Sequence, residues 1–459
     1  MSSILLMTTA PPENGPWYLG RKFLPLGLAF VAGALEKAGF QVQILDNYLL
    51  KKSLEEVKIC VKKLNPQIVG ITCGSATYHK CVETAVAIKE VLPECKIVVG
   101  GWHPSYVPDS MLQHIEIDYV VIGEGERAMT ELAIHLTGNP NAKPITQVPG
   151  IGYRKNGQII KNPPSLIMDL DEIPFAARHL FDLTRYDRKM EFLDVEPVDI
   201  MSIIRGCPFN CAFCETKKMW GPSCRFFSPK RVVEEVKYMM EKYGSKGIYF
   251  INDNFTIRKK ETLEFCKLMK QEKLDLQWIC DTRADMLNHD ILSNMKEAGC
   301  KTIWFGVESG SPRILEKINK HISIEQTEKA IKMCKQVGIQ VAASFILGIP
   351  GETVADMEES LKFAKRLNPD LCQFNTVIAY PDSLLYEELL QNGKYDNLDE
   401  FLLAAKTEEF DFEKLVAIQK RFHREFNTSP KRIMWRIRHD PLGVARTGYN
   451  ILTRKKPPQ

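Results

Sequence analysis

The chain has no long apolar run and no signal-peptide pattern. The only apolar stretch near its start, residues 4–7, is too brief for the core of a signal peptide, and no run approaches the roughly 20 apolar residues that a membrane-spanning helix needs. The net charge of +4 is too small to argue for a nucleic-acid partner. Thirteen cysteines are spread over 459 residues without a disulfide-rich pattern, so we expect mostly free thiols and a cytoplasmic location.

Three of the cysteines do stand close together. Cys207, Cys211 and Cys214 have the spacing C-x3-C-x2-C, and cysteine thiolates are the ligands of iron–sulfur clusters. A 4Fe–4S cluster held by three cysteines keeps one iron open for a substrate or cofactor, as a catalytic metal keeps an open position. The alternatives are three buried structural cysteines or part of a zinc site. Zinc wants a fourth protein ligand, and the only nearby candidate is Cys224.

The first 140 residues alternate short apolar runs with amphipathic segments. This alternation predicts an α/β domain of the doubly wound, Rossmann-like type, with a parallel sheet covered on both faces. Ligands of such domains lie beyond the carboxyl ends of the strands. The predicted strands are 4–8, 41–45, 68–72, 96–99 and 119–122, and the predicted helices include 28–38, 54–64, 78–92 and 108–113.

The rest of the chain divides into three parts. Residues 141–194 read as a linker that contains a hairpin turning at Asn156-Gly157. Residues 195–395 return to strand–helix alternation and predict a partial (β/α)6 barrel of the TIM type, whose catalytic groups lie on the loops after the strands. The extension 396–459 reads as helical across 401–426 and then basic. The predicted barrel strands are 198–204, 247–251, 277–281, 302–307, 340–346 and 371–377.

The cysteine loop follows the first barrel strand, and Phe213 directly precedes its last cysteine. In these features it closely resembles the cluster loop of radical S-adenosylmethionine enzymes. The resemblance implies a 4Fe–4S cluster, S-adenosylmethionine, and an electron donor such as a flavodoxin or ferredoxin. It also implies cofactor contacts at successive strand ends, which in this chain fall on Phe213, Asp253, Arg283, Glu308, Ser309, Gly348 and Gly351.

These contacts differ in strength. Residues 306–310 closely resemble the ribose segment of the family, and residues 345–352 resemble the segment that passes the adenine. Asp253 matches the element for the amino group only loosely, and a turn or helix cap is a comparable interpretation. Arg283 suits a carboxylate because its fork can bond both oxygens, but an ion pair at the surface is an equal alternative.

The first domain resembles the N-terminal domain of cobalamin-binding radical enzymes. Glycine-rich turns fall where its strands end or its helices begin, although ordinary turns of a doubly wound domain would look similar. The family's usual histidine ligand to cobalt is missing from residues 9–15, and His103 lies in a different loop, so we expect no imidazole below the cobalt. The implied cobalamin contacts are Leu26, Gly27, Thr72, Ser75, Gly100, Gly101, His103, Gly123 and Gly125.

Paired cofactors of this kind imply methylation of an unactivated carbon in a small or lipid-like molecule. An oxidative cyclase like anaerobic magnesium-protoporphyrin IX monomethyl ester cyclase is the main alternative, and a non-enzymatic cobalamin or redox sensor is another. Methylthio transfer is disfavoured, because cysteines 60, 73, 81 and 95 form no tight trio. The basic segments 431–438 and 454–456 fit a solvated helix packed on the barrel, or contact with anionic lipid or an apolar substrate, and RNA is a weaker alternative.

Overall fold

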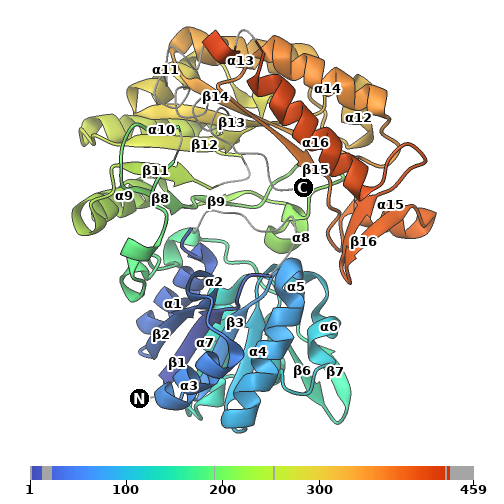
Figure 1. The fold of residues 1–459 in the computed structure, drawn as a ribbon. Coiled ribbons are helices and arrows are strands. Elements are labelled where there is room, and N and C mark those ends of the chain that lie inside the picture. Colours follow the sequence, from blue (N-terminus) through green and yellow to red (C-terminus); the bar gives the residue numbers. More distant parts are fainter. Residues whose placement is uncertain (1–2, 13–22, 191, 252–253, 430–431, 435–459) are drawn as a thin grey trace, which may run out of the picture.

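The first half of the molecule is built on a seven-stranded sheet (Figure 1). The computed structural model describes residues 3–12, 23–190, 192–251, 254–429 and 432–434. Five neighbouring strands are parallel, and two antiparallel strands extend the sheet at one edge. In sheet order the strands are β2 (Gln41–Asp46), β1 (Ser3–Thr8), β3 (Ile68–Thr72), β4 (Lys96–Gly100), β5 (Tyr119–Val121), β6 (Ile151–Lys155) and β7 (Gln158–Lys161).

Alternate side chains of each parallel strand enter two separate cores, because successive residues point to opposite faces of a sheet. Leu5 and Met7 pack with α3 and α4, whereas Ile4 and Leu6 pack with α1 and α7. The predicted doubly wound fold is confirmed, with its switch point between β1 and β3. The helices of this half are α1 (Leu26–Lys37), α2 (Asn47–Leu50), α3 (Leu54–Leu64), α4 (Tyr78–Val91), α5 (Trp102–Tyr106), α6 (Pro108–Leu112) and α7 (Gly125–Leu136).

The hairpin that we expected in the linker is β6–β7, and it belongs to the first sheet. Asn156 and Gly157 both have positive φ angles, 52° and 77°, as a tight hairpin turn requires. Tyr119 of β5 pairs with Tyr153 of β6. The first sheet therefore continues past residue 140. Short 3-10 helices occur at η1 (Ser75–Thr77), η2 (Ile145–Gln147), η3 (Leu170–Glu172), η4 (Arg178–Leu180), η5 (Leu183–Arg185) and η6 (Ala284–Met286).

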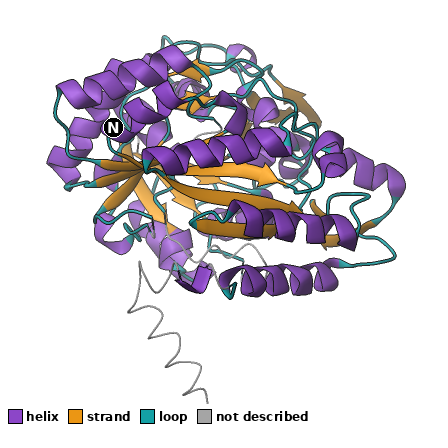
Figure 2. Cartoon of the chain, turned by 90° about the horizontal axis from the view of Figure 1, so that it is seen from above, coloured by secondary structure: helices purple, strands orange, loops and turns teal. Residues whose placement is uncertain are grey.

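The second half contains a six-stranded sheet in which all neighbours are parallel. Its order is β8 (Val198–Met201), β11 (Gly247–Phe250), β12 (Gln277–Thr282), β13 (Cys300–Glu308), β14 (Gln340–Leu347) and β15 (Leu371–Thr376). Helices surround these strands in the view from above (Figure 2), so the predicted partial barrel is confirmed. The helices are α8 (Thr216–Trp220), α9 (Pro229–Tyr243), α10 (Lys259–Gln271), α11 (His289–Glu297), α12 (Pro312–Lys317), α13 (Ile324–Val337) and α14 (Val354–Leu367).

Two small antiparallel ladders depart from the sequence-based expectations. The strand expected at 198–204 ends at Met201, and the chain then forms β9 (Ile204–Arg205), which pairs with β10 (Arg225–Phe226). The helical prediction for 401–426 is wrong at its start, because the short apolar run Leu402–Ala405 is fully buried and forms β17. The remaining elements are β16 (Tyr395–Asp399), α15 (Leu384–Asn392) and α16 (Phe412–Asn427).

The turn between β16 and β17 reaches back to the first half. The ring of Phe401 lies 4.9 Å from that of Tyr78 and 4.5 Å from that of His103. Beside it, Asp399 lies 3.0 Å from the Nε2 atom of His79. The C-terminal extension thus packs against the N-terminal domain as well as the barrel. Among the described residues, no helix combines the length and apolar character needed to cross a bilayer.

Candidate functional site

The cysteine loop begins at a glycine that no other residue can replace without movement. Gly206 has a φ of +91°, and a Cβ atom there would lie 2.3 Å from the carbonyl oxygen of Ser223. The Cys224 thiol donates a hydrogen bond to the Gly206 carbonyl, at 3.2 Å. Backbone packing therefore fixes the direction in which the chain leaves β9 and enters the loop that carries Cys207, Cys211 and Cys214.

The donor set fits an iron–sulfur cluster better than zinc. Within the described ranges, no three His, Cys, Asp or Glu side chains lie close enough together to hold one metal ion. A 4Fe–4S cluster puts each thiolate on a different iron, so its ligands need not meet at a point. Cys207 and Cys211 are partly exposed and Cys214 is exposed, whereas most other cysteines are buried. Three thiols open to incoming iron and sulfide are thus present on one loop.

A buried ion pair lies beside this loop. Glu308 ends β13 with a φ of +67°, and its Oε1 atom is 2.7 Å from Nζ of Lys320. The Lys320 ammonium lies 5.9 Å from the centre of the Phe213 ring. Burial raises the pKa of the Cys211 thiol, and the positive charges of Lys320 and Arg283 oppose that rise. Sequence reasoning missed Lys320, because a lysine in a turn after a short helix looks like a surface residue.

Arg283 is engaged in the ion pair that the sequence left open as an alternative, although its own side chain is buried and Asp285 is partly buried. Its Nε and Nη2 atoms each lie 3.0 Å from a carboxylate oxygen of Asp285. Nη2 also donates to the carbonyl of Lys320, and the guanidinium stacks 3.6 Å from the centre of the Phe209 ring. Arg283 therefore connects the cysteine loop, through Phe209, with the turn that carries Lys320. Asp253, the predicted contact for the amino group, lies outside the described residues.

The segment predicted to pass the adenine, residues 345–352, is fixed by contacts with other residues of the protein. Gly348 has a φ of +87°, and a Cβ atom there would lie 2.5 Å from the Leu415 side chain of α16. The N–H groups of Gly348 and Ile349 donate to Oε2 of Glu352, at 2.6 and 3.0 Å. Burial raises the pKa of Glu352 to about 8. This carboxyl group shapes the turn from Gly348 to Gly351 after β14.

Ser309 follows Glu308, and its side chain packs against α14. It is fully buried, and its hydroxyl lies 3.2 Å from that of Ser360 in α14. Oγ of Ser309 also accepts a hydrogen bond from the N–H of Ser311, at 3.1 Å. In this structure Ser309 fixes the turn after β13.

A cavity of about 470 Å³ lies between the two halves. One wall is formed where strands of the first sheet end, and the other contains Ile204, Arg205, Trp220 and Ile251 of the second half. Seven of the nine predicted cobalamin contacts line it: Leu26, Gly27, Thr72, Gly100, Gly101, Gly123 and Gly125. The residues present therefore fit a large flat cofactor placed at the carboxyl ends of the strands.

Ser75 and His103, the other two predicted contacts, do not line this cavity. His103 is completely buried, with Nδ1 3.1 Å from the Ser75 hydroxyl and Nε2 2.9 Å from the Ser110 hydroxyl. Burial lowers the pKa of His103 to about 4, so the ring is neutral at ordinary pH. Both ring nitrogens are engaged within the first half, which leaves His103 in a structural position.

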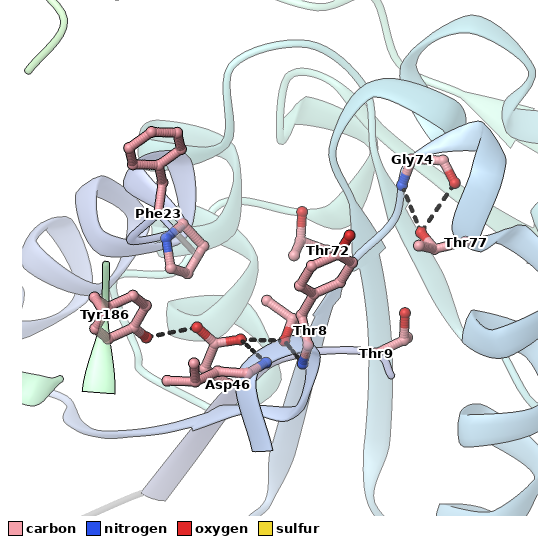
Figure 3. Close-up of a pocket in the computed structure, with 11 residues that line it drawn as sticks. Thr8, Thr9, Phe23, Asp46, Thr72, Gly74, Thr77 and Tyr186 are labelled. Carbon is pink, nitrogen blue, oxygen red and sulfur yellow. Dashed lines mark hydrogen bonds between the residues drawn. The ribbon is translucent and has the colours of Figure 1, made fainter. Parts of the chain in front are cut away.

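A second cavity, of about 220 Å³, adjoins the first and shares Pro25 and Thr72 with it. Figure 3 shows its hydroxyl-rich lining at the ends of β1, β2 and β3. Asp46 accepts hydrogen bonds from the Thr8 hydroxyl, at 2.7 Å, and from the Tyr186 hydroxyl, at 2.5 Å. Sequence reasoning missed this group, because its members come from separate strands and from the linker.

Comparisons with known proteins agree with both halves of this arrangement. The Radical SAM superfamily matches residues 201–364, and the B12 binding domain matches residues 19–133. An uncharacterized methyltransferase of Pyrococcus horikoshii is 34% identical over 438 residues, which cover 93% of each chain. The anaerobic magnesium-protoporphyrin IX monomethyl ester cyclase of Rubrivivax gelatinosus is 30% identical over 396 residues, 85% of this chain and 68% of that protein.

Solved structures show the same fold. The cobalamin-dependent S-adenosylmethionine radical enzyme OxsB, with aqua-cobalamin and S-adenosylmethionine bound, has a TM-score of 0.78 at 16% identity and covers 93% of this chain and 67% of that one. The radical S-adenosylmethionine methyltransferase TsrM from Kitasatospora setae has a TM-score of 0.73 at 15% identity, covering 92% and 89%. The relatives are enzymes, which disfavours a non-enzymatic sensor. The chain belongs to the cobalamin-binding radical S-adenosylmethionine enzymes, whose cofactors are a 4Fe–4S cluster, S-adenosylmethionine and cobalamin.

Proposed function

We propose that this enzyme methylates an unactivated carbon of a small, largely apolar molecule. The observation that carries the proposal is the cavity between the halves, whose walls come from both domains. When bound, the cluster and S-adenosylmethionine supply a radical that removes hydrogen from carbon, and cobalamin supplies a methyl group. We infer that residues 1–140 hold cobalamin with the β6–β7 hairpin as support, and that residues 195–395 hold the other two cofactors.

Cys207, Cys211 and Cys214 hold the cluster in this proposal, and the Lys320–Glu308 pair receives the methionine moiety of the cofactor. That moiety carries one carboxylate and one amino group, which match an ammonium and a carboxylate 2.7 Å apart. When the cofactor binds, its carboxylate would pair with the Lys320 ammonium and its amino group with the Glu308 carboxylate. Every charge would then still have a partner of opposite sign. Both side chains are only 9% exposed, so water competes weakly for these bonds.

The lining of the cavity supports an apolar substrate. Trp102 of the first half and Trp220 of the second have ring centres 6.0 Å apart, and Ile251 lies on the same cavity. The charged residues that line it, Glu126 and Arg205, are paired with each other. No described lining residue thus offers an unpaired charge to a substrate, which favours a lipid-like or otherwise neutral molecule.

Two further parts of the proposal concern the electron donor and the location of the enzyme. We infer that a small one-electron donor such as a flavodoxin or ferredoxin reduces the cluster from the side where Cys214 is exposed. The thirteen cysteines, none of which forms a disulfide in the structure, favour a reducing compartment such as the cytoplasm. The basic segments 435–438 and 454–456, with Lys431, lie outside the described residues, and peripheral membrane contact through them stays a prediction.

Oxidative cyclisation is the second candidate, favoured by the 30% identity with the Rubrivivax cyclase. One labelling experiment separates the two. The reconstituted enzyme is incubated without oxygen with a reductant, cobalamin, methyl-deuterated S-adenosylmethionine and small-molecule extracts, and the products are analysed by mass spectrometry. Methylation predicts a product that gains the deuterated methyl group, and Cys214→Ala should not form it. A product that has lost hydrogen or gained oxygen without label would overturn methylation and leave cyclisation.

A further inference from the structure

Four buried charged side chains join the two halves beside the cavity. Glu124 and Glu126 stand at the start of α7, whereas Arg205 and Arg225 come from β9 and β10. Their side chains are between 0% and 7% exposed. We call this group the ion-pair bridge. Nothing in the cofactor contacts proposed above makes use of it.

The geometry of the bridge is specific. Oε1 of Glu124 lies 3.2 Å from Nη1 of Arg205 and 2.7 Å from Nη1 of Arg225, which stand opposite each other in the β9–β10 ladder. The two terminal nitrogens of Arg205 also reach the two oxygens of Glu126, at 3.2 and 2.5 Å. A forked pair of this kind fixes direction as well as distance. The two glutamates also lie at a helix N-terminus, where negative charge is favoured.

The bridge is attached directly to both proposed cofactor sites. Only Gly206, whose conformation is fixed by packing, separates Arg205 from the first cluster ligand, Cys207. On the other side, Gly123 and Gly125 flank Glu124 and line the cavity. Figure 1 shows β9 at the face where the second half meets the first. The bridge is therefore a short mechanical path between the wall of the cobalamin site and the cluster loop.

Stability alone gives a poor account of this arrangement. Apolar residues of similar volume often stabilise a buried position as well as an ion pair does, because burying charges costs solvation energy. What a forked pair adds is a defined orientation. Reactions between two bound groups depend steeply on placement, and a shift of 1 Å can cost about 100-fold in rate.

We propose that the ion-pair bridge is a positioning device that sets the distance between the cluster and cobalamin, an inference that rests on the proposed function. Glu126 and Arg205 also line the cavity, and the bridge acts through Gly206 on one side and the α7 N-terminus on the other. Breaking the bridge should leave each cofactor bound in its own half while the distance between them becomes longer or more variable.

The test compares the holoenzyme with two variants and a matched control. Glu126→Gln removes one charge from the bridge and keeps the shape of the side chain. The double variant Glu126→Gln/Arg205→Met leaves no unpaired charge at that link, so it remains foldable if the single variant does not. Glu235→Gln is the control, because Glu235 is buried and bound by Arg178 and Arg231 at 3.4 and 2.8 Å, and none of these three residues lines the cavity.

The readout is the electron spin relaxation of Co(II) cobalamin, which a reduced cluster nearby accelerates in a distance-dependent way. We expect wild-type iron and cobalamin contents in all proteins, and a loss of the acceleration in the bridge variants but not in Glu235→Gln. Formation of 5′-deoxyadenosine should persist while methylated product falls by up to about 100-fold. Unchanged relaxation in the double variant would overturn the proposal.

Amide hydrogen exchange of the chain without cofactors gives an independent reading. Peptides that cover residues 204–214 should exchange faster in the bridge variants than in wild type or Glu235→Gln. If the wild-type chain retains no cobalamin, the proposed function is refuted for that cofactor. The proposal about the ion-pair bridge is then tested by amide hydrogen exchange alone. Equal exchange in all four proteins then refutes it, and faster exchange confined to the bridge variants supports a link between the halves.

Discussion

Removal of the Lys320 charge should destabilise the barrel more than removal of both charges in its pair. Lys320→Met keeps most of the volume of the side chain and deletes the ammonium that lies 2.7 Å from Glu308. The Glu308 carboxylate then remains buried without this partner. In the double variant Lys320→Met/Glu308→Gln, no charge of the pair is left to bury.

The structure sets the expected size of the two effects. Loss of one partner from a buried ion pair costs about 3–5 kcal/mol, and the 9% exposure of both side chains places Lys320→Met near the lower end, at about 3 kcal/mol. The double variant loses one hydrogen bond, worth about 1 kcal/mol. The second substitution should therefore recover about 2 kcal/mol that the first one costs.

Urea unfolding of the cofactor-free chain, followed by far-ultraviolet circular dichroism, measures both free energies of unfolding, provided that the denaturant slope stays constant. Lys237→Met is the matched control, because Lys237 and Glu272 form an ion pair 2.7 Å long whose side chains are 41% and 45% exposed. An exposed pair contributes about 0–1 kcal/mol. If the double variant is as unstable as Lys320→Met, the carboxylate is not the source of the loss and the reasoning fails.

Three further predictions concern the cofactors and pH. The triple Cys→Ala variant at positions 207, 211 and 214 should lose the cluster absorbance near about 400 nm after anaerobic reconstitution, and full iron retention would contradict the assignment. The pKa of Glu352 is raised from 4.5 to about 8 in the folded chain. Between about pH 4.5 and pH 8 the folded state therefore keeps a proton that the unfolded state has released. The free energy of unfolding should fall across this range as the pH rises. Glu352→Gln should remove that part of the decline in thermal unfolding scans from pH 5 to 8. Paramagnetic resonance of bound Co(II) cobalamin should show no splitting from a lower nitrogen, both in wild type and in His103→Phe, whereas a splitting lost in the variant would make His103 a ligand.

The strands and their order in the chain were predictable because each is a short apolar run bounded by turn residues. Residues at strand ends were predictable for a related reason, since the carboxyl ends of parallel strands gather at one edge. Thr72 and Gly100 were placed on the cavity in this way. His103 was also predicted to contact cobalamin, but it does not line the cavity, because a turn sequence says nothing about the direction of one side chain.

Contacts between charged residues far apart in the chain could not be predicted from the sequence. Glu124 and Arg205 are 81 positions apart, and each looks like an ordinary exposed charge in its own segment. Burial and pairing appear only when the halves meet. The same holds for Lys320, whose role depends on the end of β13, and for Leu402–Ala405, where four apolar residues fit a buried strand as well as a helix.

The contact of Phe401 with the first half has a consequence for how the molecule is made. The N-terminal domain leaves the ribosome first, yet one side of its Tyr78 and His103 rings packs against Phe401, which is synthesised after the last barrel strand. An aromatic face of the first domain therefore stays open during most of translation. A chain divided between the halves for separate expression keeps that face uncovered in its first fragment, wherever in the linker the division is made.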